Sequence, residues 1–444
     1  MENIISGNSK SGQLAPGARQ PARAGLAAFV GTMIEWYDFY IYGTAAALVF
    51  GQLFFPPGDP FLSRMAALGT FAVGFFARPL GGIVFGHLGD RLGRKKSLVI
   101  TLMLMGIATV CIGLLPTYQQ IGLWAPVALV ALRVLQGVAV GGEWGGAVLI
   151  AGEHAGRQRR TLFASFAQLG SPAGLILSLL AFKWVTAMEP QAMLDYGWRL
   201  PFLASAGLLL IGLLIRLGVN ESPEFETSRQ QRAASAAPLL EVVRKAWPLL
   251  LLCIGANTIG IAGVYFTNTF MIVFTTEYLG LAKSAILACL FYVAFIQFAI
   301  QPLAAWLGQR FGAARFLKIA AALAILSPYP MFVLVKQGAA SGNAWLMVMG
   351  IAICVICMAS FYSVIAGFVS GIFETRVRYT AISLSYQVCG AIAGGLTPLI
   401  GTMLAQRYHG EWWPLAIFYS LMSAVSLLSV VALDRLRHLH ADQA

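Results

Sequence analysis

Long apolar runs separated by short polar segments dominate the chain from residue 26 onward. A helix needs roughly 20 apolar residues to cross a hydrocarbon core of about 30 Å. β-Barrel strands would instead alternate in segments of about ten residues. The pattern therefore predicts an all-α polytopic membrane protein with twelve transmembrane helices, over residues 26–53, 62–86, 97–116, 123–151, 162–186, 198–218, 247–275, 284–308, 315–335, 344–369, 379–405 and 413–433.

The longest polar stretch between runs, residues 219–246, separates the sixth run from the seventh. It is a predicted central cytoplasmic loop, and it divides the chain into two six-helix bundles, over residues 25–218 and 247–434. Residues 1–24 contain no apolar stretch typical of a signal peptide, so we expect a cytoplasmic N-terminal tail. Residues 435–444 are expected to form a second cytoplasmic tail, because an even number of spans leaves both termini on one side.

Composition excludes several classes of protein. Of the 444 residues, 58% are hydrophobic and 11% are charged, whereas soluble proteins average about 25% charged residues. Neither a soluble globular protein nor a disordered chain fits these values. The net charge of +12 comes from short basic clusters between apolar runs, so no nucleic-acid partner is expected. We find no metal cluster, nucleotide-binding loop or nucleophile constellation, so neither an enzyme nor a resident cofactor is expected.

Lys and Arg residues give the expected orientation. With the N-terminus in the cytoplasm, 22 of the 30 Lys and Arg fall in cytoplasmic segments and six in external loops. The remaining two, Arg78 and Arg133, lie within spans. Cytoplasmic loops of membrane proteins carry such an excess of positive charge, so both termini are expected to be cytoplasmic.

The two halves of the chain share a weak internal repeat. Arg78 is followed by PLGG and Asp90 by RLGRKK, whereas Gln301 is followed by PLAA and Gln309 by RFGAAR. Many secondary transporters are built from two similar halves, with the substrate site between them near the midplane. The repeat therefore favours a transporter.

Five ionisable residues fall deep within predicted spans, all of them in the N-terminal half: Glu35, Asp38, Arg78, Arg133 and Glu143. Such residues are costly in a membrane and are functional candidates by default. Counting about 1.5 Å of rise per residue pairs Arg133 with Glu35 and Asp38, and Arg78 with Glu143. Glu35 and Asp38 share a helix face, so each disfavours ionisation of the other unless Arg133 offsets it. The alternative is that these charges form permanent ion pairs that only hold the bundle together.

The C-terminal half offers neutral polar groups at membrane depth instead of charges. This contrast indicates that the N-terminal half would act on a substrate electrostatically, whereas the C-terminal half would act through shape and hydrogen bonds. The candidate substrate-binding residues are Arg133, Arg78, Glu143, Tyr37, Gln136, Tyr265, Gln297, Tyr362 and Tyr386.

The loop GHLGDRLGRKK, which starts at Gly86, is a candidate conformational latch. Asp90 is placed to cap or approach the N-terminus of a neighbouring helix. Glu153, at the inner end of span four, is the expected partner of Arg94. With Arg91, these residues would stabilise one orientation of the two halves; the alternative is a basic loop that only sets topology.

The same loop, the RVLQG motif that starts at Arg133 and the two six-helix halves resemble the major facilitator superfamily. EWYDFY from Glu35, FARPLGG around Arg78, GGEWGG around Glu143 and ESPEF from Glu221 resemble its metabolite:H⁺ symporter branch. This branch includes transporters for shikimate, α-ketoglutarate, citrate and proline/betaine. The resemblance implies proton-coupled uptake across a bacterial inner membrane by alternating access.

Two departures from related patterns refine this expectation. Gln309 stands where the family's repeated motif often has Asp, so a latch in the second half should be weaker. The GSPAG sequence from Gly170 lacks most of the glycine-rich motif typical of drug/proton antiporters, which disfavours that function.

The sequence thus predicts a secondary symporter that moves a small organic acid or zwitterion inward with protons, as a monomer in the lipid bilayer and with the proton gradient as its energy source. Glu35 and Asp38 would carry the proton, and Arg133 would hold a substrate carboxylate. Arg78 and Glu143 would line or gate the inner half. A proton-driven efflux antiporter and a membrane receptor that moves nothing remain alternatives.

Overall fold

The structure is a computed structural model, and its described residues form helices joined by short connections. The expected N-terminal tail as far as residue 19, most of the expected central loop and the last three residues lie outside the described part. The described residues are 20–56, 60–222, 225–226, 243–244, 246–374 and 377–441.

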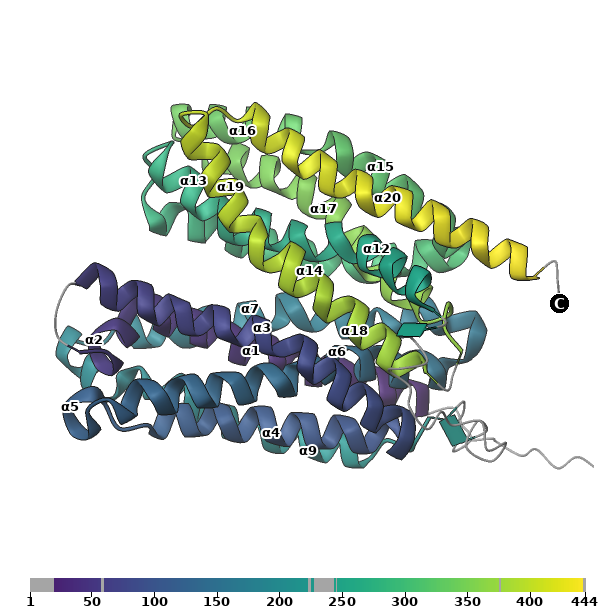
Figure 1. Ribbon diagram of the computed structural model, residues 1–444. Helices are drawn as coiled ribbons and strands as arrows, with labels where there is room; N and C mark the ends of the chain where they lie inside the picture. Colours follow the sequence, from purple (N-terminus) through teal and green to yellow (C-terminus); the bar gives the residue numbers. More distant parts are fainter. Residues whose placement is uncertain are drawn as a thin grey trace, which may run out of the picture.

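Helices from the first half of the chain form one bundle (Figure 1). Its first span is α1, which continues through a single π-helical turn, η2, into α2. The elements are α1 (Gln20–Ala45), η2 (Ala46–Phe50), α2 (Gly51–Phe54), α3 (Pro60–Leu92), α4 (Arg94–Leu114), α5 (Tyr118–Ile121), α6 (Trp124–Ala164), α7 (Phe166–Thr186), α8 (Pro190–Ala192), η3 (Met193–Gly197) and α9 (Arg199–Leu217).

Helices from the second half form the other bundle. Its first and fifth spans each contain one π-helical turn, η4 and η5. The elements are α12 (Trp247–Tyr265), η4 (Phe266–Phe270), α13 (Met271–Glu277), α14 (Lys283–Phe311), α15 (Ala313–Leu326), α16 (Pro328–Ser341), α17 (Ala344–Val369), α18 (Arg378–Cys389), η5 (Gly390–Gly394), α19 (Gly395–Arg407) and α20 (Trp413–Ala441).

Each of the twelve predicted spans corresponds to one helix or to consecutive helices. In the part of the chain that the structure describes, nine helices are long and apolar enough to cross a membrane, and the bent pair α15 and α16 makes ten. The two remaining spans are α1 and α3, which carry the buried charges Glu35, Asp38 and Arg78. The prediction of an all-α, two-bundle membrane fold is confirmed.

The internal repeat is visible in the helix geometry. Pro79 lies inside α3 and Pro302 inside α14, the second span of each half. The turns that follow these two helices contain Gly93 and Gly312, whose φ angles are 114° and 91°. A side chain is strained at such positive φ values, so glycine is required at both turns.

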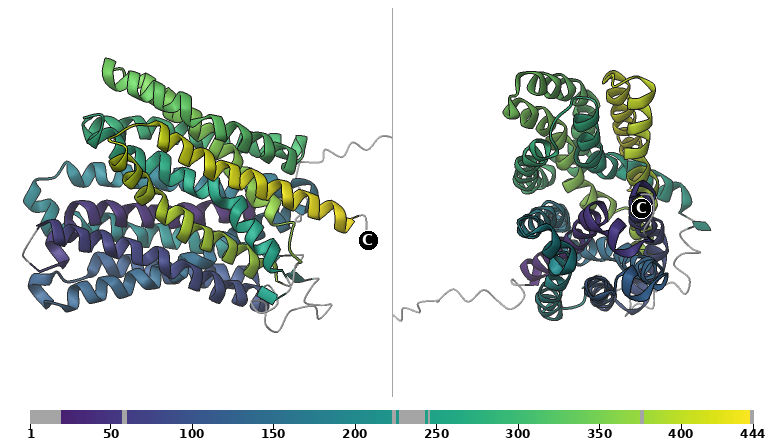
Figure 2. Two further views of the ribbon diagram at one scale, coloured as in Figure 1. Left: turned by 45° about the horizontal axis from the view of Figure 1, so that its top comes forward. Right: turned by 90° about the vertical axis from the view of Figure 1, so that its left-hand side faces the viewer.

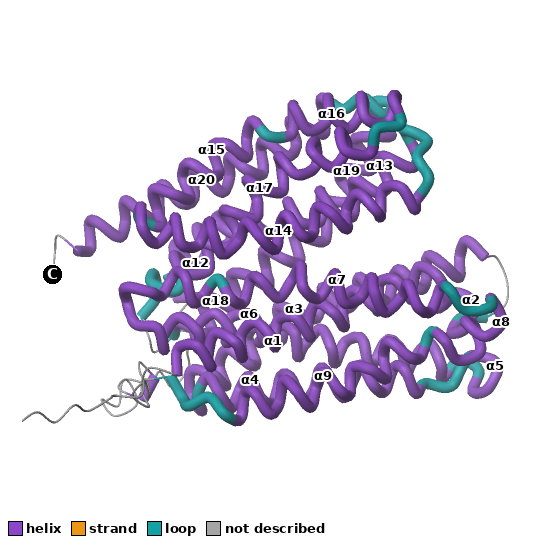
Figure 3. Tube along the Cα trace, turned by 180° about the vertical axis from the view of Figure 1, so that it is seen from behind, coloured by secondary structure: helices purple, strands orange, loops and turns teal. Residues whose placement is uncertain are grey.

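The two bundles meet on one side of the molecule and diverge on the other (Figures 1 and 3). We call the side that contains Gln20, the start of α18 and Ala441 the terminal side, and the side of α2, α5 and α13 the distal side. Viewed from the distal side, the bundles lie one above the other as separate groups of helices (Figure 2).

Close packing between α3 and α6 brings membrane-embedded charges near one another. A Cβ atom at Gly137 would lie 2.8 Å from the Cβ atom of Ala77, and one at Gly141 would lie 2.7 Å from the Cα atom of Gly81. Small residues at four-residue spacing allow this approach of helix backbones in a membrane. It places Arg78 on α3 and Arg133 on α6 around the same cavity.

Candidate functional site

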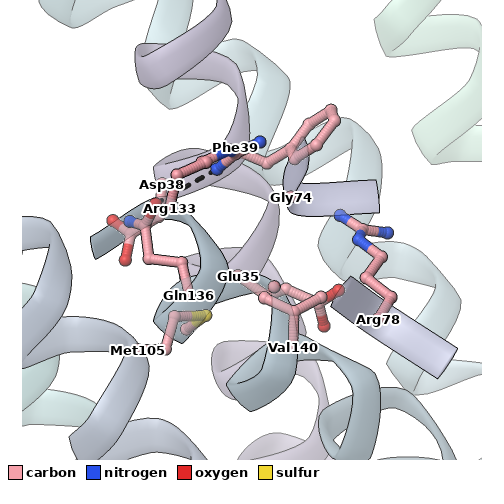
Figure 4. Close-up of a pocket in the computed structure, with 10 residues that line it drawn as sticks. Glu35, Asp38, Phe39, Gly74, Arg78, Met105, Arg133, Gln136 and Val140 are labelled. Carbon is pink, nitrogen blue, oxygen red and sulfur yellow. Dashed lines mark hydrogen bonds between the residues drawn. The ribbon is translucent and has the colours of Figure 1, made fainter. Parts of the chain in front are cut away.

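A buried cavity in the N-terminal bundle contains four of the five predicted charges. The space among its lining side chains, which includes part that is open to the surroundings, is about 250 Å³. Side chains from α1, α3, α4 and α6 line it (Figure 4). The lining residues are Glu35, Asp38, Phe39, Gly74, Arg78, Met105, Arg133, Gln136, Gly137 and Val140.

Two hydroxyl groups and a glutamine hold Asp38 in a polar network at this cavity. Thr109 and Ser205 each donate a hydrogen bond of 2.7 Å to a different carboxylate oxygen of Asp38. The Nε2 atom of Gln136 donates to the Thr109 hydroxyl at 2.7 Å, and Arg133 donates to the Oε1 atom of Gln136 at 3.1 Å. The structure thus brings Arg133 to the same cavity as Glu35 and Asp38, the two residues with which its depth pairs it.

Glu35 and Arg78 lie toward the other end of the cavity (Figure 4). The Arg78 guanidinium lies over two aromatic rings, 4.8 Å from the centroid of Phe39 and 4.7 Å from that of Phe75. The Oε2 atom of Glu35 is buried and has no hydrogen-bond partner among the described residues. This carboxylate therefore has weaker support for its charged form than Asp38 has.

The predicted pairing of Arg78 with Glu143 is wrong. Glu143 instead forms an ion pair with Arg216 on α9 and accepts a hydrogen bond of 2.8 Å from Thr101. Arg216 is only 4% exposed. Because it lies at the end of an apolar run, the count of Lys and Arg by side places it among the cytoplasmic residues. Residue counting gives the depth of a side chain in a span but not the direction in which it points, and this is why the pairing fails.

Tyr37 points away from the cavity, contrary to its predicted substrate-binding role. Its hydroxyl donates to the Pro201 carbonyl on α9 at 2.8 Å. Glu35 lies two residues before Tyr37 and therefore faces almost the opposite side of the helix.

The candidates from the C-terminal bundle lie in three places. The Tyr265 ring contacts Phe75 edge-to-face with a centroid distance of 5.6 Å, which brings it near Arg78. Gln297 is buried in α14 and does not line the cavity. Tyr362 and Tyr386 hydrogen bond to each other through their hydroxyls at 2.6 Å.

This tyrosine pair contacts the N-terminal bundle on the terminal side of the cavity. The Tyr386 ring stacks on Trp144 with centroids 3.7 Å apart. Gln168 accepts from the indole of Trp144 at 2.8 Å and donates to the Tyr362 carbonyl at 3.0 Å. In this conformation Tyr362 and Tyr386 form part of the contact between bundles.

Asp90 makes the contact predicted for the latch. Its carboxylate accepts from the backbone N–H groups of Tyr379 and Thr380, at 3.1 and 2.8 Å, and from the Thr380 hydroxyl at 2.8 Å. These donors form the N-terminus of α18, where a negative charge is favourable. The predicted approach of Asp90 to a helix N-terminus is confirmed.

The remaining latch residues divide into two groups. Arg94 lies 3.4 Å from Asp90 and 3.6 Å from Glu153, as predicted. Glu153 also forms an ion pair of 3.0 Å with Arg378 across the bundle interface. Arg91 differs from these residues: its side chain is exposed and lies 3.4 Å from the His87 ring.

The equivalent contact in the second half is weaker, as the sequence predicts. Gln309 accepts a single hydrogen bond of 3.3 Å from the backbone N–H of Leu162. Asp90 accepts three shorter hydrogen bonds at the corresponding place in the first half.

One segment that supports the latch was not predicted from the sequence. Glu221 accepts from the backbone N–H groups of Arg94 and Lys95, at 2.9 and 3.2 Å, and so caps α4. The Ser222 hydroxyl donates to Glu153, and the Phe225 ring lies 4.9 Å from the Arg94 guanidinium. The ESPEF motif contains these three residues, but one sequence cannot show where a loop segment docks.

Comparisons with known proteins agree with this architecture. The Major Facilitator Superfamily family matches residues 28–337. The shikimate transporter of Escherichia coli K12 is 37% identical over 412 residues, which cover 91% of this chain and 93% of that protein. The proline/betaine transporter of the same strain is 31% identical over 421 residues, which cover 93% of this chain and 83% of that protein.

A solved structure shares the fold. The proton:xylose symporter XylE bound to 6-bromo-6-deoxy-D-glucose superposes with a TM-score of 0.74 at 18% identity, over 93% of this chain and 95% of that chain. The chain is therefore a multi-pass membrane protein and a secondary transporter rather than an enzyme. It belongs to the Major Facilitator Superfamily, and its relatives match the metabolite:H⁺ symporter branch.

Proposed function

We propose that this transporter is a symporter that takes up a small organic acid together with a proton across the inner membrane of a bacterium. The observation that carries the proposal is the single cavity lined by two carboxylates, Glu35 and Asp38, and two guanidinium groups, Arg78 and Arg133. No cofactor is required, because the proton gradient supplies the energy. We expect the working unit to be a monomer.

Charge balance links the proton to the substrate. When both carboxylates are ionised, the four charged side chains of the cavity sum to zero. Protonation of one carboxylate leaves a net positive charge, which attracts an anion into a site of low dielectric constant. A monocarboxylate that binds then restores neutrality, so the proton and the anion are carried together.

Glu35 is the better candidate for the proton carrier. Two hydroxyl donors stabilise the ionised form of Asp38. The buried Oε2 atom of Glu35 has no hydrogen-bond partner in the described chain. Glu35, the carboxylate with fewer hydrogen bonds to the protein, is therefore tested first as the proton carrier.

The terminal side is proposed to face the cytoplasm, with both termini inside, because the excess of Lys and Arg lies on this side. The contacts of Asp90 and Glu153 with α18 then close the cytoplasmic side of the carrier. Alternating access would require these contacts to break when the bundles rock.

A binding screen comes first, because the organic acid is not identified. The names of the relatives suggest two chemical classes: shikimate is a cyclic carboxylic acid, and proline and betaine are zwitterions. Purified protein is screened by thermal shift against organic acids, aromatic acids and betaines. Stabilisation by zwitterions alone would contradict the charge-balance argument.

Transport of the best ligand then tests the direction of movement. Proteoliposomes that contain the protein receive an inwardly directed proton gradient and labelled ligand. A symporter accumulates ligand inside, an efflux antiporter empties preloaded vesicles, and a receptor moves none. Vesicles treated with a protonophore serve as the control for gradient dependence.

Glu35→Gln tests the proposed proton carrier. The substitution is nearly isosteric and removes one titrating site, so accumulation driven by the proton gradient should be lost. Exchange of labelled for unlabelled substrate should survive, because it needs no net proton movement. Glu35→Asp retains a carboxyl group and should keep part of the accumulation.

Two results would contradict this assignment. Full gradient-driven accumulation by Glu35→Gln would remove Glu35 from the proton path, and Asp38→Asn would then test the second carboxylate. Loss of both binding and exchange in Glu35→Gln would instead indicate that Glu35 supports the nearby cations structurally.

A further inference from the structure

Neither Glu143, a predicted substrate-binding residue, nor its partner Arg216 lines the first cavity. Both residues belong to the N-terminal bundle, on α6 and α9, and they are 1% and 4% exposed. Arg216 also donates to the Leu98 carbonyl, and Thr101 donates to Glu143. All of these partners lie within one bundle, so rocking of the bundles as rigid bodies would leave the pair intact.

A second cavity lies on the terminal side of this ion pair. The space among its lining side chains, part of it open to the surroundings, is about 230 Å³. The lining residues are Ala27, Lys95, Leu98, Ile150, Arg216 and Val219. Lys95, one of the lining residues, is partly exposed. This second cavity therefore lies near the surface at which α4 begins and α9 ends.

Three helices place the ion pair between the two cavities. Along α4 the order is Leu98 at the second cavity, Thr101 at the ion pair and Met105 at the first cavity. Along α6, Glu143 of the pair lies between two lining residues, one from each cavity. The agreement between helices shows that the pair occupies the space between the cavities.

Helix α1 repeats this order and leaves room for the pair. Ala27 lines the second cavity and Glu35 lines the first, with Gly31 one helical turn from each on the same helix face. A Cβ atom at Gly31 would overlap the Arg216 guanidinium and would lie 2.7 Å from Glu143. The guanidinium therefore occupies space that a side chain on α1 would otherwise fill, about 6 Å along the helix from Glu35.

We propose that the Glu143–Arg216 pair is an electrostatic seal that stops protons from leaking between Glu35 and the cytoplasm through the interior of the N-terminal bundle. The inference rests on the proposed proton-coupled function. Contacts between bundles close the route along their interface but cannot close a route inside one bundle. A fixed guanidinium repels a hydrated proton, as cationic barriers do in selective pores, and Glu143 holds this guanidinium in place.

The double variant Glu143→Gln/Arg216→Met tests the seal. Replacing both charges by neutral groups of similar size avoids leaving one buried charge unpaired, so the variant is expected to fold. The protein is reconstituted into liposomes that contain a pH-sensitive dye, and a potassium diffusion potential, negative inside, is imposed without any substrate. We expect proton entry to rise about tenfold over wild type, while substrate exchange is retained.

Three control variants make the result specific. Lys318→Met/Asp434→Asn removes an ion pair that lies outside both cavities and should leave the liposomes tight. Arg216→Lys keeps a cation at the seal and should leak less than the double variant. Adding Gly31→Ala to the double variant places a methyl group where the guanidinium was and should reduce the leak.

The possible outcomes separate the seal from the proposed function. A tight double variant that still exchanges substrate would overturn the seal and leave the pair a structural role. A double variant that fails to exchange shifts the decision to Gly31→Ala alone, which displaces the guanidinium while keeping both charges. Proton entry at the wild-type rate with Gly31→Ala would then overturn the seal. Failure of the symport proposal would be seen instead in the wild-type protein, as substrate uptake that does not depend on the proton gradient.

Discussion

Gly86→Ala should selectively destabilise the conformation in which the terminal side is closed. Gly86 on α3 faces the first turn of α18, and a Cβ atom there would lie 2.8 Å from the Cα atom of Thr380. Carbon atoms make favourable contacts at about 3.5–4.0 Å, so the bundles would have to separate by roughly 1 Å at this point. The obstacle is backbone, which cannot rotate away as a side chain can.

The size of the effect follows from the packing. Forcing one extra methyl group into a close-packed contact costs about 1–3 kcal/mol. Only the closed conformation carries this cost, because α3 and α18 separate when the terminal side opens. The ratio of closed to open molecules should therefore fall by about 5- to 150-fold.

Spin labels on the two bundles measure this ratio. Lys96 and Arg310 are exposed on the terminal side, one in each bundle, and each is replaced by cysteine in a background without the six native cysteines. Electron–electron double resonance then gives the distance distribution between the labels. Gly86→Ala should transfer population from the shorter to the longer distance.

Gly69→Ala is the matched control. Gly69 lies on the same helix, and a Cβ atom there meets nothing within 4 Å. Both substitutions replace glycine by alanine in the same helix, so each raises the helix propensity by the same amount in both conformations. If Gly86→Ala and Gly69→Ala give the same distance distribution as the unsubstituted protein, the close approach of α3 and α18 does not control closure and the reasoning is refuted.

Two further predictions concern the latch and the orientation. Asp90→Asn should shift the equilibrium toward the open terminal side by about 1–3 kcal/mol, because the amide turns an NH₂ group toward a backbone N–H donor of Tyr379 or Thr380. The spin-label assay measures this shift. An unchanged distance distribution would make Asp90 only a loop residue. Ser341→Cys should react with an impermeant maleimide added to cells that have a permeable outer membrane. Lys96→Cys should not react. The reverse pattern would invert the proposed topology.

Properties that depend on position along one span could be predicted from the sequence. Run length predicts each spanning helix, because about 20 apolar residues are needed wherever the helix sits in the bundle. The approach of Asp90 to a helix N-terminus was predictable for a similar reason, since Asp90 lies near the end of its span, three residues before the turn at Gly93. Four of the five membrane-embedded charges lie at one cavity, as expected for groups that are too costly to face lipid.

Properties that depend on the direction of a side chain were decided only by the tertiary structure. Arg78 and Glu143 lie at similar depth, yet Arg78 stacks on Phe39 and Phe75 while Glu143 pairs with Arg216. Tyr37 differs from Glu35 by two positions and turns toward α9. The rotation of each helix is set by packing against its neighbours, and one sequence contains no direct record of that packing.

The contacts between the two bundles show most clearly what the sequence predicts and what only the tertiary structure shows. The halves and their repeat can be recognised in the chain. The sequence does not show, however, that Glu153 contacts Arg378, 225 positions further along the chain, or that Tyr386 stacks on Trp144. These contacts close the terminal side, and under the proposed alternating access they would break when that side opens. The sequence by itself determined the spans, their expected orientation and the charges placed in the membrane. The tertiary structure decided which of those charges share a cavity and which seal it, because those choices depend on helix rotation and on how the bundles meet.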